Sequence, residues 1–175
     1  MTDGRIVEVT GDRPRPISEE YDPNVEVSLV IPTYDEAGNI ADLLRRLSSV
    51  LTASEMGFEL IVVDDDSPDG TWRVAADLTD EIPGLVVLRR KEASGLATAV
   101  IGGWSYARGR LLGAIDGDGQ HPPDVIPELL ASMRQGADVA VASRHLDKGG
   151  MAGWSAARRL LSRGCLLYTS PSPRD

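Results

Sequence analysis

The chain has 175 residues, of which 42% are hydrophobic, which is enough for one domain with a substantial core. Its formal net charge of −9 argues against general nucleic-acid binding, because phosphate contacts need clustered Lys and Arg. The single cysteine, Cys165, excludes a disulfide within the chain and a cysteine-rich zinc site, which favours a reducing, cytoplasmic setting. No run of 18 apolar residues occurs, so no membrane-spanning helix is expected.

The apolar pattern predicts strands and helices in strict alternation after a flexible lead-in at residues 1–24, which has several prolines and no apolar period. Asn39 is a candidate cap for the first helix, and Gly136 is placed to stop the last. The short links allow only parallel crossovers, which predicts an α/β fold with a mostly parallel, doubly wound sheet. In chain order the expected elements are strand 25–31, helix 40–51, strand 58–63, helix 71–79, strand 85–88, helix 95–107, strand 111–115, helix 122–136 and strand 137–142.

Charged residues follow the carboxyl ends of four of these strands. Open α/β sheets bind their ligands at that edge, so we interpret these strand ends as one functional rim. The residues are Asp35 and Glu36, the run from Asp64 to Asp66, Asp116 with Asp118, and Arg144.

The apolar run at residues 111–115 stops on Asp116 and Asp118, whose side chains leave a strand end on the same side. Two close carboxylates repel unless one is protonated or a cation lies between them, and Mg2+ or Mn2+ prefers such oxygen ligands. A solvated Asp-Gly turn explains the same residues without a metal. His121 is either a residue at the entry of the next helix or a further ligand.

Two earlier motifs carry similar alternatives. In the run from Asp64 to Asp66, strand alternation predicts that Asp65 and not its neighbours points into the crevice, although residues 66–70 also make a good turn. Tyr34 can stack on a flat base, or its segment is only the turn before a helix. Neither a G-x-G-x-x-G dinucleotide fingerprint nor a phosphate loop is present.

Beyond Arg144 the charge balance reverses and becomes basic. Trp154 and Leu160 belong to an apolar set that alternates with Arg158 and Arg159, which predicts a short amphipathic helix. This helix is either an ordinary surface helix of the domain or one that lies against anionic lipid.

Together these motifs resemble the inverting glycosyltransferases of the GT-A fold, most closely the polyprenol-phosphate (dolichyl-phosphate) mannosyltransferases. The resemblance runs over residues 27–163 and departs from the family in the glycine-rich stretch 116–119. It predicts a catalytic domain at residues 25–164 that is incomplete at its carboxyl end, followed at residues 165–175 by a tail that does not match the family. The segments that carry it are residues 31–39, 63–71, 116–123 and 143–150.

The resemblance implies transfer of mannose from GDP-mannose to a polyprenyl phosphate with inversion at the anomeric carbon. Asp118 and Arg144 are the catalytic residues that it implies, with Arg144 meeting the lipid phosphate, and Asp118 and Gln120 would coordinate Mg2+ or Mn2+. Asp116 and Gly117 would contact the nucleotide sugar. The full set implied to bind the nucleotide sugar is Pro32, Tyr34, Glu36, Val63, Asp65, Asp116, Gly117, Asp118 and Arg144.

The implied partners are GDP-mannose, a polyprenyl phosphate and the inner face of the cytoplasmic membrane, with no nucleic acid. A membrane-anchoring partner or a missing carboxyl-terminal segment is expected to complete the enzyme. Three alternatives stay open: transfer of glucose or another sugar, a phosphohydrolase of the haloacid dehalogenase type that uses Asp116 and Asp118, and a receiver-like domain that binds Mg2+ at Asp64 to Asp66.

Overall fold

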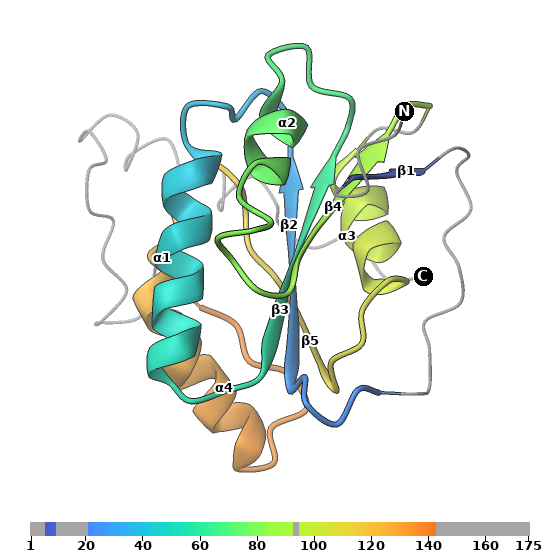
Figure 1. Cartoon of the computed structure of the whole chain (residues 1–175). Helices are drawn as coiled ribbons and strands as arrows, with labels where there is room; N and C mark the ends of the chain where they lie inside the picture. The colour runs from blue at the N-terminus through green and yellow to red at the C-terminus, as the bar shows by residue number, and fades with distance from the viewer. Residues whose placement is uncertain (1–5, 10–20, 93–94, 143–175) are drawn as a thin grey trace, which may run out of the picture. The chain divides into compact units, whose positions relative to one another are not determined.

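The computed structural model describes residues 6–9, 21–92 and 95–142. The chain divides into two compact units, Met1–Glu128 and Leu129–Asp175, and the sheet lies in the first. Its elements are labelled in Figure 1. They are β1 (Ile6–Val9), β2 (Val27–Thr33), α1 (Ile40–Ala53), β3 (Phe58–Asp64), α2 (Thr71–Ala76), β4 (Leu85–Arg90), α3 (Leu96–Trp104), β5 (Leu111–Ala114), the short 3-10 helix η1 (Pro123–Val125) and α4 (Ile126–Arg134), in which the boundary between the units falls.

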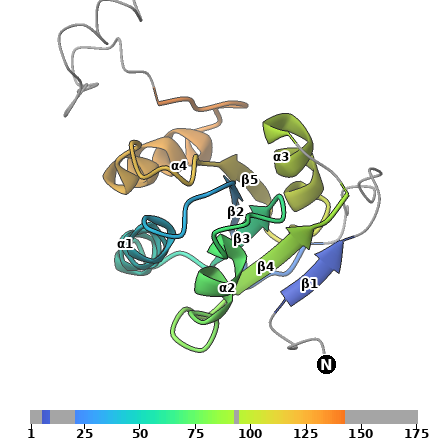
Figure 2. The same ribbon diagram turned by 90° about the horizontal axis from the view of Figure 1, so that it is seen from above.

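The five strands form one sheet in the order β1-β4-β3-β2-β5, and every neighbouring pair is parallel. Figure 2 shows α1 and α2 over one face of this sheet and α3 over the other. Every residue of β2 is buried, as expected of a strand covered on both faces. The doubly wound α/β fold predicted from the sequence is therefore confirmed.

The two faces of the sheet are packed differently. On one, α1 buries the apolar stripe from Ile40 to Leu51 that its helical spacing predicts. On the other, α3 comes close to the sheet at Gly103, where an added Cβ would lie 2.6 Å from Val30 Cγ1 and 2.9 Å from Val63 Cγ2. The small residues of α3 thus allow an approach that a larger side chain would prevent.

Strand β2 continues through Pro32 to Thr33, two residues beyond the predicted end. Pro32 lacks a backbone donor, but its nitrogen faces the β5 side, where strand pairing has already ended at Val30 with Ala114. On the other side, Pro32 and Thr33 remain in register with Val63 and Asp64 of β3. The longer strand carries Pro32 and Thr33 to the edge of the sheet where the strands end.

The structure differs from the prediction at residues 6–9, where β1 forms within the segment expected to be flexible. It pairs with β4 from Ile6 opposite Val87 to Val9 opposite Arg90. Glu8 adds ion pairs with Arg89 and with Lys91. Four residues are too few to show a strand period, so only the partner strand reveals this element.

The strand predicted at residues 137–142 is wrong, because the structure has no strand there and leaves Val139 77% and Val141 74% exposed. β-branched residues favour strands, yet a strand also needs a neighbour to bond with. β5 is likewise shorter and more exposed than predicted, ending at Ala114, with Leu112 38% exposed. In the described part of the sheet, β5 has a partner strand on its β2 side alone.

Several predictions fall outside the described residues. They concern Arg144, the basic helix around Arg158, Cys165 and the tail at residues 165–175. Within residues 6–9, 21–92 and 95–142, no helix has both the length and the apolar character needed to cross a bilayer.

Candidate functional site

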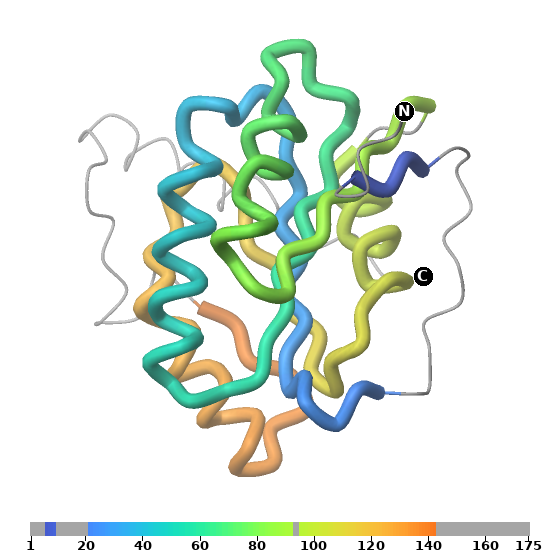
Figure 3. Tube along the Cα trace, viewed as in Figure 1, coloured from blue at the N-terminus to red at the C-terminus, as the bar shows by residue number. Residues whose placement is uncertain are grey.

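A cavity of about 490 Å³ lies where β2, β3 and β5 end and α3 begins. The loops that follow β2 and β3 lie at the same end of the sheet, as the trace in Figure 3 shows. This is the edge at which open α/β sheets bind ligands. The cavity is lined by Pro32, Thr33, Tyr34, Glu36, Asp65, Gly95, Leu96, Ala99, Asp116, Gly117 and Asp118.

Most of the site residues predicted from the sequence meet at this cavity, coming from three separate motifs. Val63 does not line it, and its side chain is fully buried in the core. Gln120 is exposed and also lies off the wall. Arg144 is outside the described residues. The predicted residues that the wall does contain are Pro32, Tyr34, Glu36, Asp65, Asp116, Gly117 and Asp118.

The loop after β2 is held by the motif that follows β3. Its backbone N–H groups donate to that motif, from Asp35 to Ser67 Oγ at 3.1 Å and from Ala37 to Asp69 Oδ2 at 2.9 Å. Asp69 also accepts the hydroxyl of Thr71 at 2.6 Å, and this bond is the main reason that its pKa lies below the ordinary value. These contacts fix a loop from which Tyr34 projects with 59% of its surface exposed.

Asn39 stands at the start of α1 as predicted, but it does not cap the helix with its side chain. Its Nδ2 donates instead to Glu36 Oε2 at 2.7 Å. The predicted side-chain cap is therefore wrong. Because Glu36 lines the cavity, the Asn39 amide orients a wall residue rather than closing the helix end.

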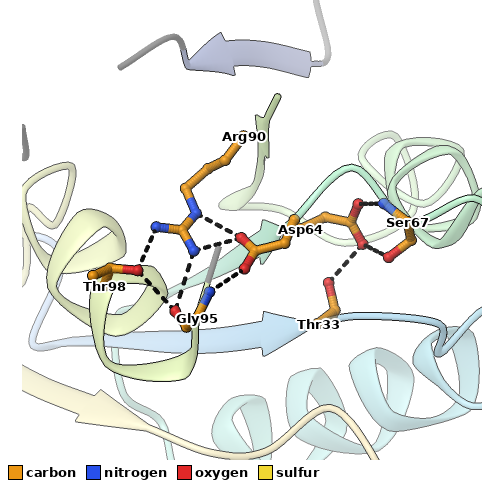
Figure 4. A network of polar contacts seen from close by, with 7 residues as sticks. Thr33, Asp64, Ser67, Arg90, Gly95 and Thr98 are labelled. Carbon is orange, nitrogen blue, oxygen red and sulfur yellow. Dashed lines mark hydrogen bonds and ion pairs between the residues drawn. The ribbon is translucent and has the colours of Figure 1, made fainter. Parts of the chain in front are cut away.

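Asp64 ties the two motifs together beneath the cavity. It is fully buried, and its Oδ2 accepts hydrogen bonds from Thr33 Oγ1 at 2.9 Å and from Ser67 Oγ at 2.6 Å, while Oδ1 accepts the Ser67 N–H at 2.8 Å (Figure 4). Burial raises the pKa of Asp64, against the opposing effect of these bonds. The residue thus has a structural role.

The three successive aspartates point in three directions, and Asp65 alone among them lines the cavity, as strand alternation predicts. Asp66 turns away at a backbone φ of 55° and pairs with Arg89. The Arg89 guanidinium also lies over the Trp72 ring, 3.8 Å from its centroid. The mutual repulsion expected of this acidic run is relieved because its members are separated and Asp65 and Asp66 pair with different arginines.

The chain after β5 passes close to the end of β2. An added Cβ at Gly117 would lie 2.8 Å from Thr33 Cγ2 and 3.1 Å from the Pro32 carbonyl oxygen, so a larger residue would force the two segments apart. This close passage puts the carboxylates of Asp116 and Asp118 on the same cavity wall.

The described residues contain no group of three or more His, Cys, Asp or Glu that could hold a metal by themselves. Asp116 and Asp118 nevertheless supply hard oxygen donors to one cavity, and the Gln120 N–H bonds to Asp118 at Oδ1 only. This donor set fits Mg2+ or Mn2+ when the remaining ligands are water and the oxygens of a bound diphosphate.

One wall of the cavity was not predicted. Gly95, Leu96 and Ala99 line it from the amino end of α3, and Thr33 joins them from β2. The small residues of α3 allow close packing on the sheet at Gly103. The small side chains also bring the start of α3 close to the strand ends. In the sequence, the glycine directly before a helix that follows a strand is the feature that could have indicated this wall.

The family model for glycosyl transferase family 2 matches residues 28–172, which extends past residue 164, the predicted end of the catalytic domain. Dolichol-phosphate mannosyltransferase of Pyrococcus furiosus is 41% identical over 143 residues, covering 82% of this chain and 40% of that protein. Undecaprenyl-phosphate mannosyltransferase of Micrococcus luteus is 37% identical over 147 residues, covering 82% of this chain and 58% of that protein. This chain thus spans about half the length of these two relatives.

A solved structure agrees at the level of the fold. The mannosyltransferase of Pyrobaculum calidifontis in complex with GDP-Man and Mn2+ superimposes with a TM-score of 0.54 at 24% identity, over 67% of this chain and 35% of that one. The family match decides against the phosphohydrolase and receiver alternatives, which belong to other families. The chain belongs to glycosyl transferase family 2.

Proposed function

We propose that this chain is the donor-binding part of a mannosyltransferase that transfers mannose from GDP-mannose to a polyprenyl phosphate. The cavity is the observation that carries the proposal. It is lined by residues from three separate motifs, among them Tyr34, Asp65, Asp116 and Asp118. The names of the Pyrococcus and Micrococcus relatives support the sugar and the acceptor, and the GDP-Man complex of the Pyrobaculum protein supports the donor.

In this proposal the guanosine lies between Tyr34 and Asp65. The exposed Tyr34 ring offers a stacking surface for the base, and the Asp65 carboxylate accepts a base N–H. Pro32 and Glu36 complete this part of the wall, and the predicted guanosine contact of Val63 remains a prediction. Asp116 and Gly117 then face the diphosphate and the sugar.

Asp118, with Gln120 beside it, would hold Mg2+ or Mn2+ against the diphosphate. When bound, the cation supplies positive charge that stabilises the departing diphosphate, so no protein acid is needed to protonate it. Asp118 is suited to this role because it lies on the wall and its loop is fixed by the Gln120 N–H, at 2.9 Å from Oδ1.

Inversion follows from a single displacement at the anomeric carbon. An oxygen of the acceptor phosphate forms the new bond to C1 while the bond from C1 to the diphosphate oxygen breaks, and GDP leaves with that electron pair. The acceptor is already an anion at neutral pH, so no strong general base is required. Arg144 would bind the acceptor phosphate, and the basic segment around Arg158 would contact the membrane surface together with an anchoring partner or a further segment.

Calorimetric titration of the chain with GDP and with UDP, each with and without Mn2+, tests this proposal. We expect GDP to bind more tightly than UDP, Mn2+ to strengthen binding, and Asp118→Ala to abolish the Mn2+ effect while leaving metal-free binding nearly unchanged. Asp124→Ala is the matched control, because Asp124 is an exposed residue near the same loop that does not line the cavity. Absence of GDP binding, or a Mn2+ effect that survives Asp118→Ala, would show the site assignment to be wrong.

A further inference from the structure

Arg90, the last residue of β4, lies beside the cavity and is not part of its wall. Its side chain is only 5% exposed. The guanidinium donates a hydrogen bond from Nε to Asp65 Oδ1 at 2.7 Å, and its Nη2 forms an ion pair with the same oxygen at 2.5 Å. Because Asp65 lines the cavity, Arg90 holds from outside the wall the side chain of a residue that a ligand would meet.

The same guanidinium holds the opposite wall. Its Nη1 donates to Thr98 Oγ1 at 3.1 Å and its Nη2 to the Gly95 carbonyl at 3.2 Å, contacts that are visible in Figure 4. The Gly95 N–H in turn donates to Asp65 Oδ2 at 2.9 Å, which closes a ring of contacts. Gly95 and Leu96 line the cavity, so one buried cation sets the distance between two of its walls.

This arrangement determines what Asp65 presents to a ligand. An ionised carboxylate has about four acceptor positions. Hydrogen bonds from Arg90 Nε and from the Gly95 N–H take one position on Oδ1 and one on Oδ2, and the ion pair with Arg90 Nη2 also lies against Oδ1, so Oδ2 is the oxygen left with an open position. The remaining position, on Oδ2, accepts an N–H and offers no donor. Guanine has a ring imino N–H on its pairing edge, whereas adenine has an acceptor nitrogen there. A carboxylate held in this way therefore favours guanine over adenine.

We propose that Arg90 is a positioning residue for nucleotide binding, which orients the remaining acceptor of Asp65 and holds the amino end of α3 at the matching distance. The inference rests on the proposed function of the cavity. It assigns base preference partly to a residue that touches no ligand, 25 positions away in the chain from the carboxylate it orients.

The test measures the affinities of GDP and ADP for the wild-type chain, Arg90→Met, Arg90→Lys and Asp65→Asn, and for the Asp65→Asn, Arg90→Met double variant. Arg89→Met is the matched control, because Arg89 is the adjacent arginine on the same strand and pairs with Asp66 instead. Circular dichroism and thermal unfolding establish that each variant is folded. Arg90→Lys retains the buried positive charge, and its GDP and ADP affinities test the proposal if Arg90→Met does not fold.

We expect Arg90→Met to weaken GDP binding about tenfold or more and to reduce the preference for GDP over ADP toward one, since hydrogen bonds to charged groups have effects of this size. Arg90→Lys should be intermediate, because an ammonium cannot bridge all three partners. Arg89→Met should match the wild type. In the Asp65→Asn background, Arg90→Met should weaken GDP binding by less than a further factor of about two, because the carboxylate through which Arg90 acts is already absent.

Three results would overturn the inference: GDP binding unchanged in the Arg90 variants, equal losses for GDP and ADP, or the full loss repeated in the Asp65→Asn background. Equal losses would indicate a general structural role, and a repeated loss would indicate that Arg90 acts independently of Asp65. If the wild-type chain binds no GDP, the proposed function fails and the inference fails with it, which is a different outcome from wild-type binding without an Arg90 effect.

Discussion

Asp64 and Asp65 are neighbours with the same side chain and opposite roles. Strand alternation turns Asp64 into the protein and Asp65 toward the cavity. Asp64 is surrounded by three donors from Thr33 and Ser67, and these bonds join the loops after β2 and β3. Asp65 lines the cavity, and Arg90 and Gly95 each donate a hydrogen bond to one of its carboxylate oxygens. The two aspartates therefore differ in role because of their burial, and not because of their residue type.

Substitution of Asp64→Asn should lower the free energy of unfolding by about 1–3 kcal/mol, because an amide nitrogen replaces one acceptor and leaves a buried donor facing it. Urea unfolding at neutral pH measures this difference. Asp66→Asn is the control, since Asp66 lies outside the buried network and Asn tolerates its backbone φ of 55°. We expect Asp66→Asn to lower the free energy of unfolding by less than about 1 kcal/mol. An equal decrease in both variants would contradict the role given to Asp64.

Asp64 should also contribute a pH dependence of defined sign. Burial raises its pKa above the ordinary value of 3.8, so the folded chain binds this proton more tightly than the unfolded chain does. The resulting stability is fully present below the unfolded pKa and is lost as pH rises through the folded pKa. The difference in free energy of unfolding between the wild type and Asp64→Asn, in favour of the wild type, should therefore be largest at acid pH. Unfolding of both proteins from pH 3 to pH 7 measures it, and a difference that grows with pH would contradict the assignment.

At the scale of elements, α3 connects the core to the site. Its carboxyl end packs tightly on β2 and β3 at Gly103, and its amino end forms the unpredicted cavity wall at Gly95 and Leu96. A shift of α3 away from the sheet would therefore change both the core packing and the cavity wall.

Two adjacent glycines of α3 test this connection. Gly103→Ala should destabilise the chain by about 1–3 kcal/mol, because the new Cβ would lie within 3 Å of the stiff Val30 and Val63 side chains. It should also weaken GDP binding by displacing the wall. Gly102→Ala meets nothing within 4 Å and should instead stabilise the helix by up to about 1 kcal/mol. Thermal unfolding and GDP titration of both variants provide the measurement, and a Gly103→Ala variant as stable as Gly102→Ala would show that α3 does not press on the sheet.

The sequence predicts the central elements well because their apolar periods are long and complete, as in α1 from Ile40 to Leu51. It also predicts which strand-end residues meet, since parallel strands bring their carboxyl ends to one edge. It does not predict β1 or the absence of a strand at residues 137–142, because pairing with another strand decides both. The contact of Arg90 with Asp65 was not foreseen either, since neither local period nor motif spacing links positions so far apart.

For the whole molecule, the central claim is that the parallel sheet brings three motifs to one cavity and that this cavity binds the sugar donor. A crystal structure of the chain with GDP-mannose and Mn2+ tests it most directly. We predict the guanine between Tyr34 and Asp65, the diphosphate and Mn2+ beside Asp118, and Arg90 in contact with Asp65 and not with the ligand. Density for the nucleotide away from these residues, or guanine beyond reach of Asp65, would contradict the account.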